Sequence, residues 1–156
     1  AAHTLDMEKE EQMLQLLVVT PTQLCKCCLR DMYKRGSGKI LNVASVGAFQ
    51  PGPYTASYYA SKSYLYQYSQ AIRLEAKKQG VQVCTLCPGS TRTHFFEKTG
   101  AKTPIWAMSP ERVAKEAWEG LNADKAVVVP GMINRLLRLV PAQIKACGVA
   151  LLKKHT

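Results

Sequence analysis

Residues 39–45, KILNVAS, and residues 81–89, VQVCTLCPG, are the stretches that decide the fold class. Each is a short, mostly apolar run that ends at a small or turn-forming residue, Ser45 in the first and Pro88 in the second. Short apolar runs bounded in this way are typical of strands buried on both faces of a sheet. A helical pattern over about residues 56–79 lies between them. The order strand, helix, strand predicts two parallel strands.

Further elements are expected on both sides of this unit. Residues about 6–34 predict a long helix, which Pro21 should kink or break in two. Another helix begins at Ser109 as its N-cap, and residues 126–129 predict a third strand. An amphipathic helical tail follows at 132–154.

These elements predict an α/β fold. We expect a partial, Rossmann-like, doubly wound parallel sheet of about three strands with flanking helices. In this interpretation residues 1–156 form a single domain that corresponds to the second half of an open α/β domain.

The chain is basic, with a formal net charge of +10 from 21 Lys and Arg against 11 Asp and Glu. Residues 131–156 contain five of these cations and no acid. Such a field can serve nucleic acid, an anionic membrane surface or a phosphate-bearing cofactor, but it is more often a solvated surface. Because basic and aromatic residues are not interleaved, we expect no nucleic-acid partner. We do not expect a membrane-surface partner either.

Six cysteines raise the question of a disulfide framework or a metal site. Cys84 and Cys87 are three apart on a predicted strand, so their thiols point to opposite faces and do not converge on one metal. Cys25 and Cys28 share a helix face, which Cys27 does not. We therefore expect buried, reduced thiols that act as small hydrophobic side chains, and no metal site.

The sequence predicts a cytoplasmic location. Its longest apolar run is too short to cross a bilayer. Acids such as Asp6 and Glu8 stand where a secretory signal would be basic. Reduced cysteines agree with this compartment.

Open α/β sheets bind ligands at the carboxyl ends of their strands, so the residues that follow each strand are candidates for chemistry. Ser45 follows the first strand, and Tyr58 and Lys62 are neighbours on one face of the next helix. An ammonium beside a phenol favours the phenolate and lowers the pKa of the tyrosine. A tyrosine tuned in this way exchanges a proton with a carbonyl or alcohol oxygen, to which Ser45 can donate a hydrogen bond.

Together these residues resemble the short-chain dehydrogenase/reductase family. The matching text is ILNVAS at 40–45, YYASK at 58–62 and CPGSTRT at 87–93, and it corresponds to the family's C-terminal portion. The resemblance implies an oxidoreductase that uses NAD or NADP to interconvert ketones and alcohols. It assigns the acid/base role to Tyr58, polarisation of the substrate oxygen to Ser45 and tuning of Tyr58 to Lys62. The cofactor-binding residues that it implies are Tyr58, Lys62, Pro88, Gly89, Thr91 and Thr93.

The resemblance also implies a substrate lid and an oligomer. Residues 94–108 match the family's variable lid over a small carbonyl or alcohol substrate. The residues at its start that can line the pocket are His94, Phe95 and Phe96. Residues 6–35 and 56–79 match helices that pack across a two-fold axis, which implies a homodimer or homotetramer.

Two features depart from the family's pattern. The ten glycines form no Gly-x-x-x-Gly-x-Gly turn, so no pyrophosphate cradle is visible, and Leu17 stands where the family usually has an asparagine. A non-catalytic, truncated relative that acts as a dimerisation or partner-binding module is therefore the alternative to an enzyme. A Ser-His-acid hydrolase is not expected, because no Gly-x-Ser-x-Gly elbow occurs.

Overall fold

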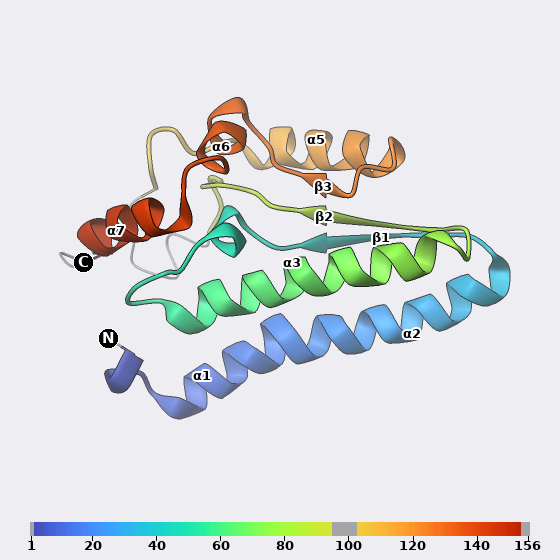
Figure 1. Ribbon diagram of the computed structural model, residues 1–156, viewed down its shortest axis with the longest axis horizontal. Helices are drawn as coiled ribbons and strands as arrows, with labels where there is room; N and C mark the ends of the chain where they lie inside the picture. Colours follow the sequence, from blue (N-terminus) through green and yellow to red (C-terminus); the bar gives the residue numbers. More distant parts are fainter. Residues whose placement is uncertain (1, 95–102, 154–156) are drawn as a thin grey trace.

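The computed structural model describes residues 2–94 and 103–153 (Figure 1). In this part of the chain three parallel strands form one sheet in the order β1-β2-β3. The strands are β1 (Gly38–Val43), β2 (Val81–Leu86) and β3 (Val127–Val128). All three lie where the sequence predicted strands. The expected α/β, Rossmann-like class is confirmed.

A long helical rod precedes the sheet. Its segments are a 3-10 turn η1 (Ala2–Thr4), α1 (Met7–Leu14), a π-helical turn η2 (Gln15–Val19) and α2 (Thr20–Arg35). Asp6 caps α1 by accepting a hydrogen bond from the backbone N–H of Glu8 at 3.1 Å. Gly36, at a left-handed φ of 65°, closes α2.

The kink or break predicted at Pro21 takes a different form. Pro21 is the second residue of α2, and the five residues Gln15–Val19 before it are wound as a π-helix, so the irregular backbone hydrogen bonding lies in the turn before the proline. The rod therefore continues through this point. Leu17 lies in the middle of the π-helical turn, a rare geometry that often marks functional sites.

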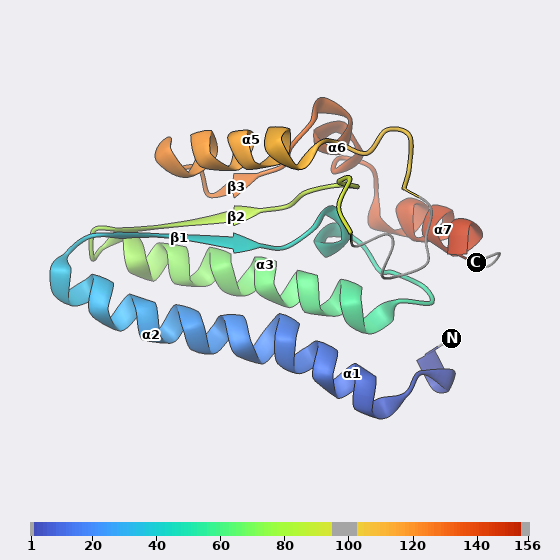
Figure 2. The same ribbon diagram turned by 180° about the vertical axis from the view of Figure 1, so that it is seen from behind.

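Helices cover both faces of the sheet, as Figures 1 and 2 show. α2 and α3 (Ala56–Lys77) lie on one face, and α5 (Pro110–Asn122) lies on the other. β2 contributes to both cores, because alternate side chains of a strand point to opposite faces. Val81 and Val83 pack with α2 and α3, whereas Cys84 and Leu86 pack with α5.

One polar cluster is buried between β1 and the helices of the first face. The amide nitrogen of Asn42 donates to Ser69 Oγ at 2.8 Å, and Ser69 Oγ donates to the Leu65 carbonyl at 2.6 Å. The Asn42 amide oxygen accepts from Cys25 Sγ at 3.4 Å. These residues come from β1, α3 and α2, so the cluster joins three elements at one point.

The helical tail is confirmed as α6 (Met132–Leu137) and α7 (Ala142–Lys153), with Pro141 between them. It lies beyond the carboxyl ends of the strands (Figure 1). Lys145 Nζ donates to the carbonyl of Phe49 at 3.3 Å, and Phe49 ends the 3-10 turn η3 (Val46–Phe49) that follows β1. The tail is thereby joined to the segment that begins at the end of β1.

Three of the six cysteines differ from the expectation of buried thiols. Cys25, Cys84 and Cys87 are buried, whereas Cys27, Cys28 and Cys147 are exposed. Cys27 lies off the Cys25 face of α2, and Cys28 is exposed although it is only one helical turn from the buried Cys25. Among residues 2–94 and 103–153, no group of His, Cys, Asp and Glu side chains could hold a metal ion.

None of the described helices is both long and apolar enough to cross a membrane.

The buried cluster generates a stability prediction. We expect Asn42→Ala to lower the free energy of unfolding by about 2 kcal/mol, because it removes a buried hydrogen bond and leaves the Cys25 and Ser69 groups without that partner. Urea denaturation followed by circular dichroism measures the change.

The matched control is Asn122→Ala. Asn122 is exposed and accepts one hydrogen bond from Lys39 Nζ at 2.7 Å, so its loss should cost less than about 0.5 kcal/mol. Equal destabilisation by the two substitutions would contradict the importance assigned to the cluster.

Candidate active site

Backbone pairing brings the ends of β1 and β2 together. The parallel pairing continues past both strands, because Ala44 N–H donates to the Leu86 carbonyl at 2.8 Å and Val46 N–H donates to the Pro88 carbonyl at 3.0 Å. This pairing places Ser45 beside Pro88 at the edge of the sheet where parallel α/β folds bind their ligands.

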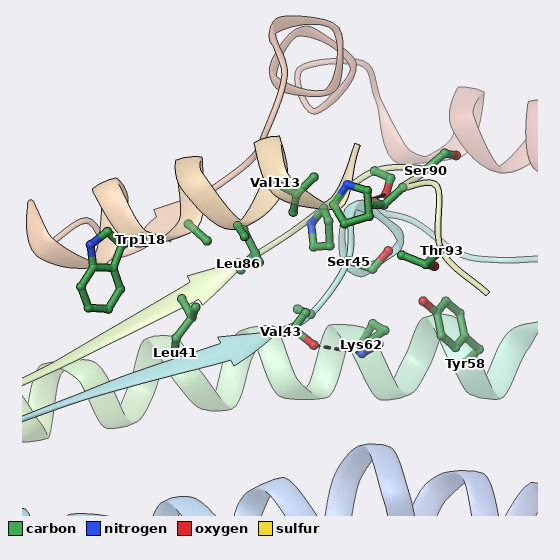
Figure 3. Close-up of a pocket in the computed structure, with 17 residues that line it drawn as sticks. Leu41, Val43, Ser45, Tyr58, Lys62, Leu86, Ser90, Thr93, Val113 and Trp118 are labelled. Atoms are coloured by element: carbon green, nitrogen blue, oxygen red, sulfur yellow. Dashed lines mark hydrogen bonds between the residues drawn. The ribbon is translucent and has the colours of Figure 1, made fainter. Parts of the chain in front are cut away.

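Ser45 is held at the start of η3. Its Oγ accepts a hydrogen bond from Gly47 N–H at 3.1 Å, which caps this turn. Tyr58 stands in the first turn of α3, and a side-chain hydrogen bond with Ser45 acts to lower the pKa of its phenol. Figure 3 shows both side chains at the cleft. The serine is therefore oriented by the backbone on one side and linked to the tyrosine on the other.

Lys62 lies one helical turn after Tyr58, on the same side of α3. Its Nζ donates to the carbonyl of Val43 at 2.9 Å, the dashed line in Figure 3. Nζ also lies 5.9 Å from the centroid of the Tyr58 ring. The two side chains are neighbours, as the spacing predicted.

The pKa of Tyr58 is shifted up, which differs from the lowering expected from the sequence. Burial is the larger cause, and the hydrogen bond from Ser45 offsets part of it. Burial lowers the pKa of Lys62. The difference arises because desolvation disfavours both charged forms, a cost that residue spacing does not reveal.

A cleft of about 580 Å³ opens between these residues and α5. The structure brings together at this cleft every residue that the sequence analysis placed in the catalytic or cofactor-binding set. They are Ser45, Tyr58, Lys62, Pro88, Gly89, Thr91 and Thr93. Their roles remain predictions.

The segment after β2 is shaped by its own hydrogen bonds. Thr91 Oγ1 donates to the Gly89 carbonyl at 3.1 Å, and Met108 N–H donates to the Ser90 carbonyl at 2.9 Å. A Cβ at Gly89 would lie 2.5 Å from the side-chain oxygen of Asn134 on α6, so this position accepts only glycine without movement. The loop is thus held against the tail.

Sequence reasoning missed the apolar wall of the cleft. The wall comes from β1 and from one side of α5, and its members include Leu41, Val43, Val113, Ala117 and Trp118. The indole of Trp118 is 64% exposed, as is common for a binding surface and unusual for a core. Residues two apart on a strand share a face, so the positions of Leu41 and Val43 on β1 could have placed both side chains on one side of the sheet.

Three residues predicted at the start of the lid are not placed at the site. His94 is described but does not line the cleft. Phe95 and Phe96 lie outside the described residues.

A family model described as short chain dehydrogenase matches residues 1–104. The 7beta-hydroxysteroid dehydrogenase of Clostridium sardiniense is 29% identical over 133 residues, 83% of this chain and 51% of that protein. The 17-beta-hydroxysteroid dehydrogenase 13 of Mus musculus is 33% identical over 116 residues, 71% of this chain and 38% of that protein.

A solved short-chain dehydrogenase from Sphingobium yanoikuyae in complex with NADPH superposes with a TM-score of 0.78 at 25% identity. The superposition covers 95% of this chain and 56% of that one. The match thus spans 51% and 38% of the two curated relatives and 56% of the solved one.

Burial at the site also generates a prediction about thiol reactivity. The pKa of the Cys87 thiol is raised to about 12, mainly by burial, so it stays protonated and unreactive at pH 8. We expect a disulfide reagent such as Ellman's to modify the three exposed cysteines rapidly and the three buried ones only after denaturation.

Mass spectrometry of the labelled peptides identifies which thiols have reacted. Rapid labelling of Cys87 in the native protein would contradict the burial of the β2 end.

Proposed function

The chain belongs to the short-chain dehydrogenase family, and we propose that it carries the catalytic site of an NAD- or NADP-dependent oxidoreductase that interconverts a ketone and its alcohol. The observation that carries the proposal is the convergence of Ser45, Tyr58 and Lys62 on one cleft at the carboxyl ends of β1 and β2. The relative solved with NADPH supports a nicotinamide nucleotide as the cofactor.

In this proposal Ser45 and Tyr58 act on the substrate oxygen. The Ser45 hydroxyl donates a hydrogen bond to the carbonyl oxygen, and Tyr58 Oη delivers the proton that completes the alcohol. Burial favours the phenol form of Tyr58, which is the form that donates. In the oxidation direction the Tyr58 phenolate accepts the proton of the alcohol. A bound nicotinamide supplies or accepts the hydride at the carbon.

Lys62 is assigned a positioning role. Its hydrogen bond to the Val43 carbonyl fixes the ammonium beside the Tyr58 ring, where it stabilises the phenolate formed when the proton leaves. An ammonium has three N–H donors, so two remain for the hydroxyls of a ribose.

The residues present fit the nicotinamide end of such a cofactor. The cleft joins the Lys62 ammonium and the Thr91 and Thr93 hydroxyls to an apolar wall, which suits a polar ribose attached to a flat ring. The described residues provide no glycine-rich helix N-terminus for a pyrophosphate. We therefore assign the phosphate cradle to a segment outside residues 1–156.

This assignment makes residues 1–156 one domain that is the C-terminal, catalytic half of a Rossmann-type dehydrogenase. The shares of the relatives that the match covers, 38%, 51% and 56%, support this view. β1 supports it as well, since it lies at the edge of the described sheet, where a further parallel strand can add.

The alternative is a non-catalytic module that binds a partner through the same open edge. Sequencing the coding DNA upstream of Ala1 separates the two. An in-frame strand followed by a glycine-rich turn and a helix supports the enzyme, and a stop codon there supports the module.

We propose an apolar ketone as the substrate class. The wall formed by Leu41, Val43, Val113 and Trp118 offers little to a polar substrate. Two relatives named as hydroxysteroid dehydrogenases agree with a large apolar ligand.

We also propose a homodimer or homotetramer that uses the rod and α3. Leu16 and Leu24 on the rod and Leu74 on α3 are exposed, as expected of helices that meet a second copy. Sedimentation velocity measures the oligomeric state.

The central test is Tyr58→Phe in the longest in-frame product that contains this chain. Loss of the phenol oxygen should lower kcat for ketone reduction by at least about 100-fold, because no other group delivers the proton, while binding of the nicotinamide nucleotide changes little. NADPH and NADH oxidation with bulky ketones measures the rate, and nucleotide fluorescence measures binding.

The matched control is Tyr64→Phe. Tyr64 lies on α3 outside the cleft and shares a hydrogen bond with Thr22 at 3.1 Å, so its loss should leave kcat within about twofold. Retention of full activity by Tyr58→Phe would overturn the assignment of the acid/base group.

Ser45→Ala tests the link between the hydroxyl and the tyrosine. The Ser45 hydrogen bond stabilises the phenolate, so its removal should raise the pKa of Tyr58 further. The rise of kcat/KM with pH for alcohol oxidation should therefore move to higher pH, with a maximal rate about 100-fold lower.

Ser45→Thr keeps the hydroxyl and should restore the wild-type pH profile. A profile of Ser45→Ala that does not move, or moves to lower pH, would show that the two side chains are not coupled.

A further inference from the structure

A second cavity lies between the tail and the turn that follows β1. We call it the tail cavity, and its volume is about 300 Å³. Its walls come from η3 and the residue after it, from the end of α6 and from one side of α7. It shares no lining residue with the cleft of the candidate active site. Its volume lies at the lower end of the range that holds small organic ligands.

The walls of the tail cavity combine apolar side chains with hydrogen-bond donors. The apolar members are Val46, Phe49, Leu137 and Val149. The polar members among the described residues are two cations and two amides, with no carboxylate, and they are Arg138, Lys145, Gln50 and Asn134. A few convergent donors in an apolar cavity are typical of a ligand site.

Both cations of the tail cavity are held at Phe49. Lys145 Nζ donates to the Phe49 carbonyl at 3.3 Å, and the Arg138 guanidinium lies 4.8 Å from the centroid of the Phe49 ring. Arg138 also donates to the Tyr66 hydroxyl at 3.4 Å. An ammonium has three N–H donors and a guanidinium has five, so these contacts leave donors of both side chains for a further acceptor.

The two cations lack a counter-ion. Within residues 2–94 and 103–153 neither Arg138 nor Lys145 pairs with a carboxylate, whereas Arg135, on the same helix as the end that carries Arg138, pairs with Glu116 at 2.9 Å. Burial and then the charge of Arg138 lower the pKa of Lys145. A bound anion would remove this repulsion between like charges.

We propose that the tail cavity binds an organic carboxylate that carries a short apolar chain. The carboxylate accepts hydrogen bonds from Arg138 and Lys145, and the chain packs against Phe49 and the apolar side chains of the tail. An inorganic anion would leave the apolar walls in water, and a neutral ligand would leave the two cations uncompensated. The site is independent of the proposed catalytic function, because the cleft is lined by other residues.

The test is isothermal titration calorimetry with octanoate on the longest in-frame product that contains this chain, at about 0.1 M salt. Octanoate should bind at least about tenfold more tightly than acetate, which lacks the chain, and than octanamide, which lacks the charge. Inorganic phosphate should also bind at least about tenfold more weakly, because it gains nothing from the apolar walls.

Three substitutions at the tail cavity should weaken octanoate binding. Arg138→Gln and Lys145→Gln should each weaken it about tenfold, because each removes a charged hydrogen-bond donor. Gly148→Leu should weaken it at least about tenfold by filling the cavity beside α7. A Cβ at Gly148 meets no atom within 4 Å, and leucine favours a helix more than glycine does, so this variant should fold even if loss of Lys145 loosens the tail.

The matched control is Lys125→Gln. Lys125 is exposed between α5 and β3 and does not line the tail cavity, so its loss removes the same charge and should leave octanoate binding within about twofold. Circular dichroism confirms that each variant is folded. Binding of octanamide, acetate or phosphate as tight as that of octanoate would overturn the proposal. Unchanged octanoate binding by Gly148→Leu, or an equal loss in Lys125→Gln, would also overturn it.

Discussion

Two backbone hydrogen bonds beyond the ends of the strands hold the segments from which the site is built. They join Ala44 to Leu86 and Val46 to Pro88, and they continue the parallel pairing after the strands themselves have ended. Since Ser45 lies between the two donors, its Cα has little freedom to move relative to the loop after β2. The paired backbone on both sides fixes where the Ser45 side chain begins, and the hydrogen bond from Gly47 N–H then fixes the direction of its hydroxyl.

The same strand also fixes α3, because two successive residues of β1 bond to two points on one face of that helix. The Asn42 side chain bonds Ser69, and the Val43 carbonyl accepts from Lys62. Lys62 and Ser69 are seven residues, or two helical turns, apart, so the two bonds lie along one stripe of α3. Together these two hydrogen bonds set the position of α3 along its axis and its rotation about that axis. Tyr58, one turn before Lys62, is carried to Ser45 as a consequence.

Much of this arrangement could be predicted from the sequence. Strand positions follow from apolar runs that end at Ser45 and Pro88, and the convergence of Tyr58 and Lys62 follows from the four-residue spacing on a helix. What could not be predicted depends on burial. The upward shift in the pKa of Tyr58 arises from desolvation, which outweighs the hydrogen bond from Ser45.

The orientation of the tail escaped prediction for a related reason. An amphipathic pattern identifies two faces of a helix but does not say which one meets the protein. In α7 the face that meets the protein is the one that carries Lys145, whose Nζ reaches the Phe49 carbonyl beside a small cavity. The exposure of Cys27 and Cys28 on α2 is a similar case, because a small side chain such as cysteine is tolerated on either face of a helix.

Phe49 lies between the tail and the turn that follows β1. Its carbonyl accepts from Lys145 and its ring lies under Arg138, while its own turn, η3, begins at the Ser45 N-cap. The tail is therefore packed against the other end of the four-residue turn whose first hydrogen bond orients the Ser45 hydroxyl. The Gly89 loop meets Asn134 of α6 in the same region. The tail therefore lies against both segments, after β1 and after β2, whose residues line the cleft.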